Sequence, residues 1–143
     1  MSRALKWWMM VTDIGFLAYW SISALALFGA ISLPPDWMYG GFDDPRVVAW
    51  NWSFLSIDLP FSILGLAAVA AHRRARDSWR ALAILSLAFT FAAGGMAISY
   101  WAILGEWDPF WFLSNLLIMV WPLFFLPGLV ASASPHQAHD SAA

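Results

Sequence analysis

The stretch Val47–Ala71 decides the fold, and it reads VVAWNWSFLSIDLPFSILGLAAVAA. It is apolar over a length sufficient to cross a bilayer, which takes about 20 helical residues. Asp58 lies in its middle, roughly 16 Å from Val47 along a helix. A carboxylate near the bilayer centre costs roughly 2.5–3.5 kcal/mol on insertion scales. Because a leucine there would avoid this cost, Asp58 is the first candidate functional residue.

Three further apolar runs flank this stretch, at Trp8–Ser32, Ala81–Leu104 and Phe110–Ser132. Each is long enough for one membrane crossing. The pattern predicts an all-α protein, a bundle of four transmembrane helices that forms one domain over residues 1–132. The residues after it, 133–143, are small and polar, which is typical of a disordered tail.

Composition agrees with a membrane protein and excludes several other classes. The 143 residues are 62% hydrophobic and 11% charged, whereas soluble domains are about 45–50% apolar and about 25% charged. The absence of cysteine excludes disulfides and thiolate chemistry. Seven basic residues in 143 argue against nucleic-acid binding. His136 and His139 have the spacing of metal ligands but lie in the tail, so we expect neither a metal nor a cofactor.

The basic residues also predict the orientation in the membrane. Cytoplasmic loops of membrane proteins carry an excess of Lys and Arg. Arg46 is the one basic residue predicted on the outer side. The others are Arg3 and Lys6 before the first helix, and Arg73, Arg74, Arg76 and Arg80 between the second and third. We therefore expect both termini in the cytoplasm and the protein in a bacterial inner membrane.

Polar residues concentrate around Asp58 on the second predicted helix. Asn51, Asp58 and Ser62 share one face through spacings of seven and four residues. Pro60 removes one backbone hydrogen bond and frees a carbonyl near Ser56. We therefore predict a kink with spare acceptors beside the carboxyl group.

Other polar residues lie at a similar depth on neighbouring helices. Asn115 and Tyr100 fall near the outer ends of the fourth and third helices, where they would converge with Asn51 above Asp58. Asp13 lies about one turn inside the cytoplasmic boundary of the first helix. It could reach the headgroup level, pair with an arginine of the second loop, or assist Asp58.

Asp58 has no cationic partner within the predicted spans, because none of the four apolar runs contains Lys or Arg. Desolvation disfavours the charged carboxylate, so we expect Asp58 to rest protonated. A proton, a ligand amine or a bound cation would complete the site. The alternative is a neutral, hydrogen-bonded acid that holds helices together.

Small residues and tryptophans have simpler expected roles. Ser86, Thr90 and Gly94 follow at four-residue spacing, which favours close approach of another helix. Most of the 11 tryptophans fall near predicted helix ends, where indole rings favour the headgroup level.

Two segments resemble the YvaD-like small bacterial membrane proteins, a four-helix family of unknown function. They are Thr12-Asp13-Ile14-Gly15-Phe16 with Tyr19-Trp20, and Asp44-Pro45 through Ala49-Trp50-Asn51-Trp52-Ser53-Phe54 to Asp58-Leu59. The resemblance implies a fold and no activity. It adds weight to Asp13, Asn51 and Asp58 as a set.

Three functions remain open from the sequence. In the first, a polar site around Asp58 binds a small lipophilic or cationic ligand or carries a proton, with Asn51, Asn115, Tyr100 and Asp13 assisting. In the second, the chain is an accessory subunit of a larger membrane complex, or a homodimer, whose small-residue stripe contacts a partner. In the third, Asp58 and Asp13 are the acid and base of a lipid or sterol isomerase.

Overall fold

The computed structural model describes residues 1–34 and 37–133, and every regular element within them is helical. The predicted tail, with His136 and His139, lies outside the described residues apart from its first residue. The elements in chain order are α1 (Arg3–Leu27), α2 (Pro45–Ser53), α3 (Leu55–Arg73), α4 (Trp79–Leu104), α5 (Pro109–Val120), the 3₁₀ turn η2 (Trp121–Phe124) and α6 (Leu126–Ala133).

Four helical stretches of the described chain are long and apolar enough to cross a membrane, as the sequence predicted. They are Arg3–Leu27, Pro45–Arg73, Trp79–Leu104 and Pro109–Ser132. The all-helical fold class with four such helices is confirmed.

The first helix begins at Arg3 rather than at Trp8 and ends at Leu27 rather than at Ser32. The Ser2 hydroxyl caps its start by accepting the Leu5 N–H at 3.1 Å. Its end is a Schellman motif, in which Gly29 has a φ of +71°. The Gly29 N–H donates to the Ala26 carbonyl and the Ala30 N–H to the Leu25 carbonyl. The run of apolar residues beyond Leu27 therefore belongs to a loop.

Phe54 divides the second span into α2 and α3. Its N–H and the Ile57 N–H both donate to carbonyls three residues earlier, so the helical pattern skips the carbonyls of Trp50 and Ser53. The Ser53 hydroxyl donates to the Trp50 carbonyl at 2.6 Å, and the Ser56 hydroxyl donates to the Ser53 carbonyl at 2.8 Å. These two serines satisfy the acceptors that the break leaves over.

The sequence predicted a kink at Pro60, and the break lies six residues before that proline. The carbonyl that a proline ring displaces is the one four residues earlier, here that of Ser56, so the carbonyls of Trp50 and Ser53 at the break lie one to two turns further up the chain. Pro60 itself lies inside α3. The consequence is that Asp58 occupies the first turn of α3.

Prolines also interrupt the fourth span. Pro122 lies at the start of η2 and Pro127 is the second residue of α6. Pro has no N–H to lose at the first turn of a helix, so both residues begin new segments at low cost.

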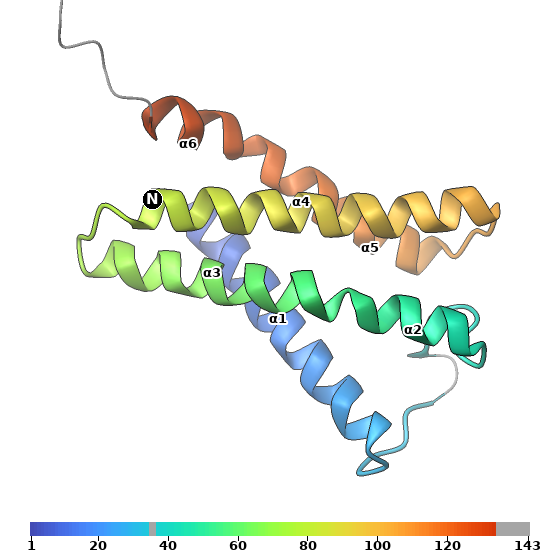
Figure 1. Cartoon of the computed structure of the whole chain (residues 1–143). Helices are drawn as coiled ribbons and strands as arrows, with labels where there is room; N and C mark the ends of the chain where they lie inside the picture. Colours follow the sequence, from blue (N-terminus) through green and yellow to red (C-terminus); the bar gives the residue numbers. More distant parts are fainter. Residues whose placement is uncertain (35–36, 134–143) are drawn as a thin grey trace, which may run out of the picture.

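The spans follow one another in space as α1, α3, α4 and α5, because α3 packs on both α1 and α4, and α4 packs on α5. Figure 1 shows α3 and α4 as a long antiparallel pair, with α1 crossing α3 obliquely and its C-terminal half diverging from α2. Aromatic rings link α1 to the fourth span. Trp8 stacks on Trp121 at 5.7 Å, and Tyr19 meets Trp111 edge-on at 6.4 Å between ring centroids.

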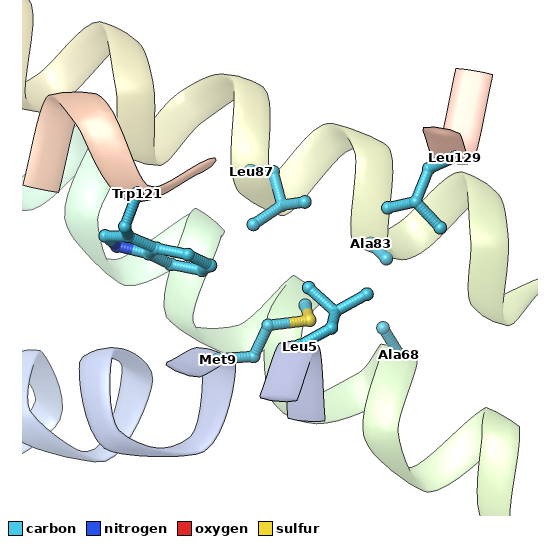
Figure 2. Packing of buried hydrophobic residues seen from close by; sticks show 7 residues of the cluster. All are labelled: Leu5, Met9, Ala68, Ala83, Leu87, Trp121 and Leu129. Carbon is cyan, nitrogen blue, oxygen red and sulfur yellow. The ribbon is translucent and has the colours of Figure 1, made fainter. Parts of the chain in front are cut away.

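A hydrophobic cluster closes the end of the bundle near the N-terminus. Figure 2 shows Leu5 and Met9 of α1 pointing toward Ala83 and Leu87 of α4, with Trp121 beside them. Ala68 of α3 and Ala83 of α4 also belong to the cluster, and these small side chains allow the four spans to converge. The opposite half of the bundle has a second cluster around Trp20, Phe54 and Phe61.

The small-residue stripe of α4 is covered within the chain. A Cβ at Gly94 would lie 2.6 Å from the Met119 N and 2.7 Å from the Asn115 carbonyl oxygen, so α5 packs against this glycine. On the α3 side, the Ser86 hydroxyl donates to the Phe61 carbonyl at 2.9 Å. The predicted close approach is confirmed, and its partners are α3 and α5.

Candidate functional site

A cavity of about 620 Å³ lies between α1, the α2–α3 break, α4 and α5. The aromatic side chains that line it include Trp20, Trp50, Trp101 and Trp111. These tryptophans therefore line a hollow between the helices that is partly open to the outside, in addition to any part they play at the helix ends. The polar residues that line it are Thr12, Tyr19, Tyr39, Asn51, Asp58, Ser114 and Asn115.

Asp58 is the buried acid of this cavity, with 2% of its surface exposed. The Trp20 indole N–H donates to Asp58 Oδ2 at 3.0 Å. Asp58 Oδ1 is also buried and has no hydrogen-bond partner. Most buried polar atoms in proteins do have partners, so an unpaired carboxyl oxygen in a residue that lines a cavity calls for an explanation.

Asn51 and Tyr19 form the side of the cavity near the α2–α3 break. The Tyr19 hydroxyl donates to Asn51 Oδ1 at 3.3 Å, which links α1 to α2. Tyr19 also meets the Trp20 ring edge-on at 5.1 Å. This contact places the tyrosine beside the indole that binds Asp58.

Tyr39 brings the loop between α1 and α2 to the same cavity. Its ring meets Trp111 edge-on at 6.1 Å. Burial raises the pKa of the Tyr39 phenol above its ordinary value, and repulsion from an ionised Tyr19 would act in the same direction. The phenol is therefore neutral near pH 7 and can donate a hydrogen bond.

Asn115 enters the cavity from α5. Its Nδ2 donates to the Trp111 carbonyl one turn earlier at 2.7 Å. This bond fixes the orientation of the amide. The structure therefore places three of the five predicted residues, Asp58, Asn51 and Asn115, around one cavity.

Tyr100 does not line this cavity. Its ring stacks on Trp50 with centroids 3.7 Å apart and planes at 17°. It faces a separate shallow groove that Ser99 and Ile103 share. The neighbouring residue Trp101 is buried and lines the cavity, and consecutive residues on a helix point in different directions.

Asp13 is buried in a different place, at the crossing of α1 and α3. It has 1% of its surface exposed and forms no ion pair with an arginine of the described chain. A Cβ at Gly65 would overlap its carboxyl group, so α1 approaches α3 through the space that this glycine leaves. Asp13 Oδ2 has no hydrogen-bond partner, and the residue does not line the Asp58 cavity.

Trp20 is a residue of the candidate site that the sequence did not single out. Its position in an apolar helix, away from either end, was a usable signal. A buried indole N–H needs an acceptor, and the Asp58 carboxyl is the buried acceptor it finds. Within the described residues no group of three or more His, Cys, Asp or Glu side chains could hold a metal ion.

Comparison with known proteins places the chain in a family. Residues 5–136 match the family of unknown function DUF5360. The uncharacterized protein YvaD of Bacillus subtilis (strain 168) is 36% identical over 124 residues, which cover 87% of this chain and 90% of that protein. No solved structure matches. The resemblance stated from the sequence is thus confirmed, and the chain belongs to the DUF5360 family, together with YvaD-like proteins.

Proposed function

We propose that this protein is an integral protein of a bacterial cytoplasmic membrane, with both termini in the cytoplasm. Four apolar helices and a bacterial relative support the membrane and its source. Arg3, Lys6 and Arg73 line one groove, so the N-terminus and the loop after α3 share one end of the bundle. An excess of basic residues at one end is typical of the cytoplasmic side.

We further propose that the cavity binds a small lipophilic ligand that carries an amine or another hydrogen-bond donor. The observation that carries this proposal is Asp58 Oδ1, a buried carboxyl oxygen without a partner in a residue that lines the cavity. A ligand N–H or N⁺–H at this atom would satisfy an acceptor that is costly to leave unpaired. Trp20 holds the other oxygen and so orients the carboxyl group.

The remaining lining suits the apolar part of such a ligand. Small-molecule sites are commonly apolar cavities of about 300–1,000 Å³ with a few placed polar groups. This cavity has about 620 Å³, and no Lys or Arg lines it within the described chain. Trp50, Trp101 and Trp111 offer ring faces that attract a cation. Tyr19 and Asn51, which are hydrogen-bonded to each other, line the cavity near the amine or other donor of the proposed ligand.

The other two hypotheses receive less support from the geometry. An isomerase would need its acid and base around one substrate, whereas Asp13 lies outside the cavity that Asp58 lines. The accessory-subunit hypothesis used the stripe of Ser86, Thr90 and Gly94 as a contact surface, and all three residues are buried inside the chain.

Proton transfer is a second candidate, favoured by a column of buried polar atoms along α3. Asp58 Oδ1, Ser62 Oγ and Asp13 Oδ2, at the Gly65 position, all lack partners. Successive steps along the helix rise by roughly 6 Å and 4.5 Å. Proteoliposomes containing a pH-sensitive dye test this role: Ser62→Ala should slow proton entry if the column conducts. Equal rates of proton entry for wild type and Ser62→Ala, or for wild type and protein-free vesicles, contradict it.

A brominated alkylamine tests the ligand proposal directly, because bromine quenches the tryptophans that line the cavity. The matched probe is the brominated alcohol of the same chain length, which lacks the charge. We expect Asp58→Asn to weaken amine binding by roughly tenfold or more and to leave alcohol binding unchanged. Asp13→Asn is the control, since it removes a buried carboxyl group outside the cavity. Equal amine binding by wild type and Asp58→Asn contradicts the proposal.

A further inference from the structure

A second hollow, of about 820 Å³, follows the outside of α1 near the end of α3. We call it the α1 groove. Its apolar part is formed by Trp7, Met10, Val11 and Ile14. Spacings of three and four residues place these side chains on one helix face. Trp7, Val11 and Ile14 are exposed, so nothing in the described chain covers this face.

One end of the α1 groove is strongly basic. Arg3 and Lys6 line it from α1, and Arg73 reaches it from the end of α3. No carboxylate lines it in the part of the chain that the structure describes. Asp77, the acidic residue of the adjoining loop, is not among its lining residues. The three positive charges are thus gathered without a counter-charge in the groove.

The groove is charged at one end and apolar along the rest of its length, as a phospholipid is. Arg3 and Ile14 are separated by roughly 16 Å along the helix, with cations at one end and apolar side chains over the rest. Arginine binds phosphate through parallel N–H donors, and basic pockets at the cytoplasmic side of helices bind anionic headgroups.

We propose that the α1 groove binds one anionic phospholipid. Its phosphate lies among Arg3, Lys6 and Arg73, and one acyl chain follows Trp7 to Ile14. The charge complementarity selects an anionic over a zwitterionic lipid. This site is independent of the ligand proposed for the Asp58 cavity. It does adjoin that cavity, because Val11 and Gly15 line both hollows.

Native mass spectrometry of the full-length protein tests this site. Phosphatidylglycerol and phosphatidylcholine are offered in equal amounts, and the lipid that stays bound is counted. We expect one phosphatidylglycerol to be retained in preference to phosphatidylcholine. Arg3→Gln/Lys6→Gln/Arg73→Gln should weaken that preference by roughly tenfold or more. The matched control is Arg74→Gln/Arg76→Gln/Arg80→Gln, which removes the same charge at the same end and should keep most of the preference.

Two further arms identify the source of the phosphate and the position of the lipid. Soluble glycerol 3-phosphate in excess should not displace the lipid, because it lacks the acyl chain that the groove holds. A phosphatidylglycerol with a photoreactive acyl chain should label residues 7–14 of α1. The proposal is overturned if both triple variants lose the preference equally, if the soluble phosphate displaces the lipid, or if labelling falls elsewhere in the chain.

Discussion

The two buried acids of this bundle have opposite surroundings. Asp58 lines a cavity, receives a hydrogen bond from Trp20 and keeps one oxygen free. Asp13 is just as buried, but its carboxyl group fills the notch that Gly65 leaves in α3. Burial of an acid is therefore not enough to mark a binding site. The position of the residue makes the difference, because Asp58 lines the cavity and Asp13 does not.

The largest effect should come from Gly94→Ala, which acts on the α4–α5 contact beside the Asp58 cavity. The new Cβ would meet backbone atoms of Met119 and Asn115, which cannot rotate away. We expect a loss of about 3 kcal/mol or more in unfolding free energy, together with weaker amine binding. Gly95→Ala is the control, because its Cβ meets only the Met119 sulfur at 3.7 Å. Equal stability of the two variants in detergent unfolding would show that α5 does not pack at Gly94.

Gly65→Ala should disrupt the packing around Asp13, the acid that lies outside the cavity. Its Cβ would lie 2.7 Å from Asp13 Cγ and 2.9 Å from Ser86 Oγ. We expect a loss of about 2–3 kcal/mol from overpacking. Adding Asp13→Ala should restore part of this loss, because it removes the group that clashes. A double-mutant cycle in unfolding free energy measures this coupling. Strictly additive effects of the two substitutions would contradict the packing of Asp13 against Gly65.

Trp20→Phe should lower the unfolding free energy by a smaller amount, through its effect on Asp58. It keeps an aromatic ring but removes the N–H that Asp58 Oδ2 accepts. Leaving that oxygen unpaired should cost about 1–2 kcal/mol. If Trp20 orients the carboxyl group, amine binding should weaken as well. Trp111→Phe, which changes another cavity ring without touching Asp58, supplies the control, and identical unfolding for both would count against the hydrogen bond.

Tyr19→Phe should have the smallest effect, a loss below about 1 kcal/mol. The variant loses the 3.3 Å bond to Asn51 and the hydrogen bond with Ser23, and it keeps the ring contacts with Trp20 and Trp111. Amine binding should change less than in Trp20→Phe. A larger loss of binding in Tyr19→Phe would shift the donor-binding position from Asp58 toward Asn51.

The comparison also shows what the sequence could predict. Asp58, Asn51 and Asn115 were recognised because polar residues in apolar runs are costly at any rotation of the helix. Tyr100 was misplaced because rotation decides which of two adjacent aromatic residues faces inward, and both Tyr100 and Trp101 suit either side. The place of Asp13 depends on Gly65, which is remote in sequence and becomes a notch only when α1 crosses α3 there. The break at Phe54 depends on serine hydroxyls that compete for backbone carbonyls, a balance that spacing alone does not reveal.

Ligand-dependent thermal unfolding of three proteins, wild type, Asp58→Asn and Asp13→Asn, tests the central claim most directly. A ligand that binds the folded state stabilises it by about 2.7 kcal/mol at a hundred times its Kd. With a saturating long-chain alkylamine, we predict a raised Tm for wild type and for Asp13→Asn, and little change for Asp58→Asn. A shift of equal size in Asp58→Asn and wild type would contradict the assignment of Asp58 as the anchor of the cavity.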